Sequence, residues 1–312
     1  MPPVLEAKNL VKWFSGDGEA VYALRGVNLR VEQGQIVALL GPNGSGKSTF
    51  MKITVGVLTP TEGEVRVFGK EPYKDVEVRG RLSYMPQDAG LYQSLTGFEN
   101  YMFYASIQGV RREKALKMLE ELKDDVGLGR WFYKRRVSTY SGGMKRKTSL
   151  AVALASNPEF MVLDEPTTGL DPASRRNLWK ILEVLQSRGK TILLATHLFD
   201  DAEYLADNIV VMYKGKVVAS APPKDLKRKA GYGYAVDVDF AEEPSREVVE
   251  RLKLPGCRVI PSGGFRVTVV GNSPGLMGEV EERLAGVKVL AVRMRKISLG
   301  DVYFLLTGVS LE

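Results

Sequence analysis

The 312-residue sequence holds one cysteine, Cys257, and one histidine, His197. A single cysteine excludes an internal disulfide and a metal site made of several cysteines, and a single histidine excludes a metal site with several histidine ligands. No apolar run reaches the ~18–20 residues that a membrane-spanning helix needs. The sequence has no internal repeat with a period of about 20–50 residues, which excludes a repeat protein. The first residues hold neither a basic stretch nor an apolar one, so we expect no secretory signal and a cytosolic protein.

The composition is that of a globular protein, with 44% hydrophobic and 26% charged residues. The length suits two domains better than one. The net charge of +7 comes from 44 basic and 37 acidic residues, and the excess is spread over short clusters. Such a mild and dispersed charge is not typical of a nucleic-acid-binding surface, so we expect no nucleic-acid partner.

The first part of the chain alternates strand-like and helix-like segments, which is typical of an α/β domain built on a parallel sheet. Strand signals are missing between Asp88 and Asn157, and residues 111–126 have helical periodicity. Thr96 and Glu99 have the spacing of a capping box at a helix start. We therefore expect a helical insertion over about residues 88–157. Apolar runs that suit strands buried on both faces occur at 35–40, 82–85, 160–163, 191–196 and 208–213.

Proline, charge and glycine come together at residues 221–233 and indicate a domain boundary. We place a first domain at 1–225, a linker at 226–233 and a second domain at 234–312. The segments after the linker follow the order β-α-β-β-α-β. This order predicts a small α+β domain of the ferredoxin-like kind, in which we find no catalytic motif.

Two local signals refine this second domain. Ser273 followed by Pro274 predicts the N-cap and first position of a helix that runs to Leu284. A Ser-Gly-Gly turn at 262–264 predicts a hairpin between two short strands.

A glycine-rich loop follows the apolar run at 35–40 and precedes a predicted helix. It fits the pattern G-x-x-x-x-G-K-[ST], in which backbone N–H groups surround phosphate oxygens and a Cβ would obstruct that approach. The helix N-terminus further favours an anion. Lys47 can reach the β- and γ-phosphates, and the Ser48 hydroxyl can bind Mg²⁺. The candidate nucleotide-binding residues of this loop are Gly41, Asn43, Gly44, Ser45, Gly46, Lys47, Ser48 and Thr49.

A second candidate element is the apolar strand at 160–163, which ends in the carboxylates Asp164 and Glu165. Asp164 would reach the metal of a bound nucleotide. Glu165 suits a group that orients or deprotonates an attacking water. An apolar strand followed by acids is a weak signal alone, and it gains weight beside a phosphate loop.

With these motifs in this order, residues 4–225 resemble the ATP-binding cassette (ABC) family. Gln87, after Tyr84-Met-Pro86, matches the family's Q-loop glutamine, and His197 matches its switch histidine. Tyr140-Ser-Gly-Gly-Met144 resembles the signature sequence, and Gly169-Leu-Asp171 resembles the D-loop. Phe14 stands where the family places an aromatic residue that stacks on adenine, with Trp13 as the alternative.

The resemblance implies a phosphate-loop NTPase fold with a parallel-sheet core, an antiparallel β subdomain and the helical insertion. It also implies ATP and Mg²⁺ as ligands, and two cassettes packed head to tail around each ATP. Ser141, Gly142 and Gly143 would hold the γ-phosphate of the partner's ATP, and Asp171 of the D-loop would also contact nucleotide. The implied catalytic residues are Glu165, His197, Lys47 and Gln87, and the implied metal ligands are Ser48, Gln87 and Asp164.

The signature departs from the common family pattern at two positions, where Tyr140 replaces leucine and Met144 replaces glutamine. Met144 cannot donate a hydrogen bond. Lys147 replaces a frequent arginine, which removes planar bidentate pairing. None of the three changes removes a group needed for hydrolysis, so we expect an active ATPase.

The signature and the segment Ile297-Ser-Leu-Gly-Asp-Val-Tyr303 resemble the drug-resistance and sodium-extrusion (ABC-2 type) export group. The resemblance implies the motor subunit of an exporter, bound to a separate transmembrane permease on the inner face of the membrane and paired with a second cassette. The alternative is a soluble ABC ATPase that acts on ribosomes or nucleic acid. An aromatic stripe after Gln87 fits either a permease-docking groove or core packing; it comprises Tyr92, Leu95, Phe98, Tyr101 and Met102.

Overall fold

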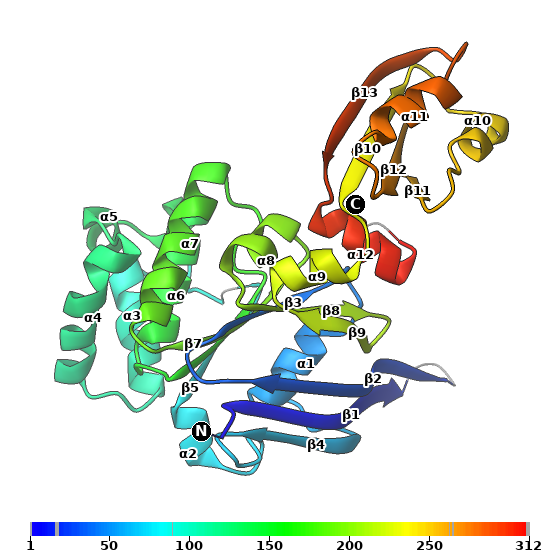
Figure 1. Cartoon of the computed structure of the whole chain (residues 1–312). Coiled ribbons are helices and arrows are strands. Elements are labelled where there is room, and N and C mark those ends of the chain that lie inside the picture. The colour runs from blue at the N-terminus through cyan, green and yellow to red at the C-terminus, as the bar shows by residue number, and fades with distance from the viewer. Residues whose placement is uncertain (1, 16–18, 89, 262, 264, 310–312) are drawn as a thin grey trace. The chain divides into compact units, whose positions relative to one another are not determined.

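A computed structural model describes residues 2–15, 19–88, 90–261, 263 and 265–309. The chain forms two compact units, Met1–Ser220 and Ala221–Glu312. Figure 1 shows the elements of each unit by colour along the chain. The candidate nucleotide-binding residues all belong to the first unit.

A six-stranded sheet in the order β5-β6-β7-β3-β8-β9 forms the core of the first unit. β3 (Ile36–Leu40) lies inside the sheet and pairs in parallel with β7 (Thr191–Thr196) and β8 (Asn208–Tyr213). All five residues of β3 are buried because helices and a second sheet cover both faces. The predicted parallel strands are thus confirmed. The other strands are β5 (Leu82–Met85), β6 (Phe160–Asp164) and β9 (Lys216–Ala221).

A separate antiparallel sheet has the order β2-β1-β4, with β1 (Leu5–Ser15), β2 (Ala20–Val31) and β4 (Glu62–Val67). Apolar patterning alone did not predict these strands. The pairing of β1 with β2 is interrupted by register shifts, which break the alternation of apolar and polar residues. α1 (Lys47–Thr54) packs between the two sheets, and its buried Phe50 and Met51 join the shared hydrophobic core.

The segment predicted as a helical insertion is helical. Thr96 caps α3 by accepting from the Glu99 backbone N–H, and the Glu99 side chain accepts from the Thr96 N–H, so the predicted capping box is confirmed. The helices of the segment are α3 (Gly97–Ile107), α4 (Arg112–Val126), α5 (Arg130–Lys134), a 3-10 turn (Val137–Thr139) and α6 (Gly142–Leu154). The first unit also holds α2 (Val76–Gly80), α7 (Pro172–Ser187) and α8 (Phe199–Leu205).

The second unit has the predicted order β-α-β-β-α-β, followed by a further helix. Its antiparallel sheet has the order β11-β12-β10-β13. Val236 and Val238 of β10 face a hydrophobic core that includes Leu276 and Val280 of α11. The elements are β10 (Tyr234–Phe240), α10 (Arg246–Arg251), β11 (Arg258–Pro261), β12 (Arg266–Gly271), α11 (Leu276–Arg283), β13 (Val289–Lys296) and α12 (Leu299–Thr307).

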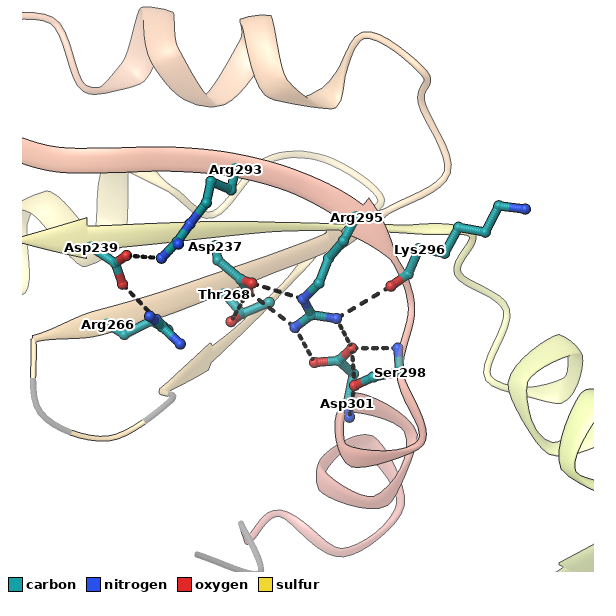
Figure 2. Close-up of polar contacts among 9 residues, drawn as sticks. All are labelled: Asp237, Asp239, Arg266, Thr268, Arg293, Arg295, Lys296, Ser298 and Asp301. Carbon is teal, nitrogen blue, oxygen red and sulfur yellow. Dashed lines mark hydrogen bonds and ion pairs between the residues drawn. The ribbon is translucent and has the colours of Figure 1, made fainter. Parts of the chain in front are cut away.

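The opposite face of this sheet carries a network of charged side chains (Figure 2). The Arg295 guanidinium lies between Asp237 of β10 and Asp301 of α12 and donates to both, with N–O distances of 2.6–3.0 Å. Asp239 accepts from Arg266 and Arg293. The hydrogen bonds that Arg295 donates to Asp301 and Asp237 raise its pKa against the effect of burial. The guanidinium therefore ties α12 to the sheet.

Two local expectations for the second unit were wrong. The first half of the predicted linker at 226–233 belongs to helix α9 (Pro223–Lys229), which packs against α12. The boundary between the units lies after Ser220. Ser273 is not an N-cap, because its hydroxyl accepts from the Gly275 N–H in a turn, and the helix begins at Leu276. The predicted turn at 262–264 includes residues 262 and 264, which lie outside the described residues.

Candidate nucleotide site

The phosphate loop connects β3 to α1, and two of its glycines have no room for a side chain. A Cβ on Gly41 would lie 2.4 Å from the Met212 carbonyl oxygen. Gly46 has a φ of 104°, and a Cβ there would lie 2.5 Å from the Ala23 carbonyl oxygen. Within the described part of the chain, no side chain caps α1, so the first N–H groups of this helix are available to an anion.

The Lys47 side chain is held against the first residues of this loop. Its ammonium donates to the carbonyl oxygens of Gly41 (2.6 Å) and Pro42 (3.2 Å) and lies 3.5 Å from Oε1 of Glu165. Only 5% of Lys47 is exposed. Burial lowers its pKa, while the negative charges of Glu165 and Asp164 oppose that shift. The structure therefore brings the loop lysine and the β6 carboxylates together.

Asp164 is the last residue of β6 and is 3% exposed. Its Oδ2 accepts from the Tyr84 hydroxyl at 3.3 Å, and among the described residues no donor reaches its buried Oδ1. Burial and the charge of Asp164 raise the pKa of Tyr84. The hydroxyl oxygen of Ser45 in the loop is likewise buried and without a hydrogen-bond partner among the described residues. Buried polar atoms of this kind indicate a place for a ligand.

Glu165 begins the turn after β6 with a φ of 50°, which is unusual for a residue with a side chain. Its Oε2 lies 2.8 Å from Nδ1 of His197 and accepts from the Thr168 hydroxyl at 3.0 Å. His197 directly follows β7, the strand beside β6. Because parallel strands end at the same edge of a sheet, the acid and the histidine meet beside the phosphate loop.

The oxygen donors present fit Mg²⁺, which prefers carboxylate and hydroxyl oxygens and usually takes few protein ligands together with substrate phosphates. Asp164 offers a buried oxygen to which none of the described residues donates, and Ser48 stands in the first turn of α1. In the described residues no cluster of three or more His, Cys, Asp or Glu side chains could hold a metal by itself. The donor set therefore suits a metal that arrives with a nucleotide.

The signature residues neighbour the D-loop of their own chain. Ser141 caps α6 by accepting from the Met144 N–H. The atoms nearest to a Cβ built on Gly142 belong to Gly169 and Leu170, and Ser174 is nearest to Gly143. The structure thus brings the signature to the D-loop rather than to the phosphate loop of the same chain.

Asp171 caps α7 by accepting from the N–H groups of Ala173 and Ser174, both at 3.0 Å. The hydrogen bond from the Ser174 hydroxyl contributes most to lowering the pKa of Asp171. This carboxylate therefore has a local structural role in the single chain.

Gln87 follows β5 and is exposed, and its carbonyl oxygen accepts from Arg146 of α6 at 3.0 Å. Burial lowers the pKa of Arg146, and the charges of Glu165, Asp88 and Asp164 oppose that shift. Arg146, the middle residue of the basic run Lys145-Arg146-Lys147, thus lies close to the site carboxylates.

Phe14 lies on β1 and is 42% exposed, whereas its neighbour Trp13 is partly buried. Phe14 pairs with Val21 of β2, two residues before Ala23, whose carbonyl oxygen adjoins Gly46. A more exposed ring suits stacking on a base, so exposure favours Phe14 over Trp13.

Sequence reasoning missed several residues that hold the site. Tyr84 and Thr168 contact Asp164 and Glu165, and Asp201 of α8 accepts from Thr167 and Thr196. A hydroxyl or acid near a motif carries little signal in sequence, because its partner depends on how the strands are arranged.

The comparisons with known proteins agree with this geometry. Residues 24–168 match the model of the family described as ABC transporter. The daunorubicin/doxorubicin resistance ATP-binding protein DrrA of Streptomyces peucetius is 35% identical over 97% of this chain and 92% of its own length. ABC transporter A family member 8 of Arabidopsis thaliana is 32% identical over 95% of this chain, which spans 34% of that protein.

Solved structures give the same result. The dimeric ATP-binding cassette MJ0796, in a post-hydrolysis state bound to ADP and Pi, matches with a TM-score of 0.64 and 29% identity over 70% of this chain and 98% of its own. Another match, titled as the ATP binding subunit of an ABC transporter, has a TM-score of 0.64 and 30% identity over 73% of this chain and 93% of its own.

The fold, the phosphate loop and the full-length similarity place the chain in one family. It belongs to the ATP-binding proteins of ABC transporters, and it is an ATPase of the cassette type. The resemblance read from the sequence is thereby confirmed. The alternative of an ATPase acting on ribosomes or nucleic acid is not supported, since the matched family model and these relatives are described as transport proteins or cassettes.

Proposed function

We propose that this protein is the motor subunit of an exporter, in which two cassettes close head to tail on ATP and hydrolysis resets them. The observation that carries the catalytic part is the meeting of Lys47, Glu165 and His197 at the edge where β3, β6 and β7 end. The export direction is taken from similarity to the drug-resistance protein DrrA. The transported compound would be recognised by the membrane partner.

In the proposed site, the loop from Gly41 to Thr49 surrounds the phosphates and Lys47 neutralises the β- and γ-oxygens. Phe14 stacks on the adenine. Asp164, Ser48 and Gln87 would hold Mg²⁺, which supplies positive charge to the phosphate oxygens. Glu165 orients and deprotonates the attacking water, and His197 fixes that carboxylate and contacts the γ-phosphate.

The signature acts across the cassette pair in this proposal. Ser141, Gly142 and Gly143 present the N-terminus of α6 to the γ-phosphate held by the partner cassette. Asp171 and the D-loop lie beside them in the same chain. Closure of the pair would therefore place a signature, a D-loop and a phosphate loop around each ATP.

No helix within the described residues is long and apolar enough to cross a membrane. We propose that the chain reaches the inner face of the membrane through a separate permease. An exposed aromatic cluster beside the Q-loop supports this docking: Tyr92 is 48% and Phe103 37% exposed, with ring centroids 4.9 Å apart. Tyr101 of the predicted stripe is instead fully buried and donates to the Ala115 carbonyl oxygen, which is a core role.

The proposal is tested by purifying the protein from its host in mild detergent and identifying stoichiometric partners by mass spectrometry. We expect a membrane protein with several apolar spans. A matched variant, Tyr92→Ala with Phe103→Ala, should lose that partner and keep the ATPase activity of the isolated cassette. Recovery of ribosomal proteins or nucleic acid in its place would contradict the transport proposal and leave the ATP chemistry intact.

A further inference from the structure

One fully buried carboxylate lies behind the proposed catalytic residues. Asp201 of α8 is 0% exposed. Its Oδ2 accepts from the hydroxyls of Thr167 and Thr196, the latter at 3.1 Å. Its Oδ1 accepts from the Trp179 indole N–H at 2.9 Å. Arg175 Nε lies 3.8 Å from the same oxygen.

The two threonines belong to the two segments that carry the proposed catalytic pair. Thr196 directly precedes His197, its hydroxyl accepts from the Leu198 N–H at 3.0 Å, and its carbonyl oxygen accepts from the Gly41 N–H at 3.3 Å. Thr167 directly precedes Thr168, whose hydroxyl donates to Glu165. One side chain therefore joins the turn after β6 to the end of β7.

The same carboxylate reaches the helix that follows the D-loop. Trp179 lies on α7, whose N-cap is Asp171. The Arg175 guanidinium stacks over the Trp179 ring at 5.1 Å and also pairs with the exposed Asp200. A shift of α7 would therefore act on Asp201 directly.

A carboxylate suits this position better than any neutral side chain. It has no proton to donate when ionised, so it can accept from all three donors at once. Burial raises the pKa of Asp201, while the hydrogen bonds from Thr167, Trp179 and Thr196 and the charge of Arg175 oppose that shift. The side-chain amide of an asparagine here would turn its NH₂ group toward some of these donors. The threonine hydroxyls would then have to rotate to accept from it.

We propose that Asp201 is a positioning residue for ATP hydrolysis, which fixes the threonines beside Glu165 and His197 and so holds that pair in contact. This inference rests on the roles proposed above for Glu165 and His197. It assigns Asp201 no contact with ATP. The residue acts through the two backbone segments and should affect turnover rather than nucleotide affinity.

The single histidine of the chain gives a direct readout. Protein labelled with ¹⁵N-histidine and carrying a tag without histidines shows the ring nitrogens of His197 alone. We expect the Nδ1 resonance in Asp201→Asn, Thr167→Val and Thr196→Val to move toward its position in Glu165→Gln. The control Asp200→Asn, which changes an exposed acid that pairs with the same arginine, should leave the resonance in place.

Kinetics supply the second readout. In Asp201→Asn we expect kcat to fall about 10–100-fold, since small displacements of catalytic groups cost rates of this size, with the affinity for a fluorescent ATP analogue unchanged. Thr167→Ser and Thr196→Ser keep the hydroxyls and should restore turnover relative to the valine variants. The threonine variants also test the idea if Asp201→Asn does not fold.

Two results would overturn the inference. One is an unchanged kcat and an unmoved histidine resonance in folded Asp201→Asn, Thr167→Val and Thr196→Val proteins. The other is a loss of activity that follows the melting temperature and ATP affinity while the resonance stays in place, which would make Asp201 purely structural. Normal turnover in Glu165→Gln would instead refute the role of Glu165, whatever the resonance does in Asp201→Asn.

Discussion

Glu165 Oε2 and His197 Nδ1 lie 2.8 Å apart although the residues are 32 positions apart in the sequence. Thr168 donates to the same oxygen, while Oε1 lies 3.5 Å from the Lys47 ammonium. One carboxylate thus faces the histidine with one oxygen and the loop lysine with the other. This arrangement suits a group that receives a proton beside a phosphate.

Replacing Glu165 with Gln should preserve ATP binding, trap a closed cassette pair and lower kcat by about 10²–10⁴-fold, because the amide cannot accept the proton of water. Steady-state ATPase assays and light scattering with and without ATP measure both effects. Wild-type protein without nucleotide is the reference for the mass measured by light scattering. Turnover close to wild type would contradict the proposed role.

Replacing Gly46 with Ala should destabilise the protein and weaken ATP binding, because the new Cβ would meet the Ala23 carbonyl oxygen at 2.5 Å. Backbone strain alone costs about 1–3 kcal/mol for a non-glycine residue in an unusual conformation. Gly34→Ala is the matched control, since Gly34 has a φ of 77° and open space around it. Chemical denaturation gives the free energy of unfolding of both variants, and the difference between them measures the cost of the contact with the Ala23 carbonyl oxygen. Equal losses of stability in the two variants would show that the structure accommodates this contact without cost.

A chain that ends at Pro222 should bind ATP with the affinity of the full protein. The phosphate loop, β6 and β7 all lie in the first unit, which ends at Ser220. Ending the chain at Ala230 should also keep ATP binding but leave α9 without its partner α12. Titration with a fluorescent ATP analogue measures the affinity. A folded truncation that no longer binds ATP would show that the second unit contributes to the site.

The second unit should lose stability in acid through Asp301. Burial opposes the shift, but hydrogen bonds from Arg295 and Ser298 lower the pKa of this carboxyl below its usual value. A group whose pKa is lower in the folded state stabilises the fold above its unfolded pKa of about 4. That contribution is lost as the pH falls through the lower folded value.

The acid effect can be checked by hydrogen exchange in α12, corrected for intrinsic rates, between neutral pH and pH values below the unfolded pKa. We expect the protection of wild-type α12 to fall more steeply than in Asp301→Asn, which has already lost the ion pair with Arg295. Glu242→Gln, at an exposed position outside this network, should behave as wild type. If the protection of α12 fell equally steeply with pH in wild type and in Asp301→Asn, Asp301 would not be the source of the acid effect.

The strands of the parallel sheet could be predicted because burial on both faces demands continuous apolar runs, as in β3 and β6. The strands β1 and β2 could not, because their register shifts break the alternating pattern. The boundary between the units was predicted too late in the chain, because proline and charge occur both in linkers and in short helices such as α9.

The amino-acid sequence by itself determined the phosphate loop, its Lys47 and the pair Asp164–Glu165, because these depend on residue types at fixed short spacings. It also determined the family, through motifs in a fixed order. Only the tertiary structure decided that Glu165 contacts His197, and that Asp164 keeps one buried oxygen without a partner among the described residues. It also decided that Asp201 joins the turn after β6 to the end of β7. These relationships depend on which strands lie side by side, and hydrophobic burial of β6 against β7 fixes that order.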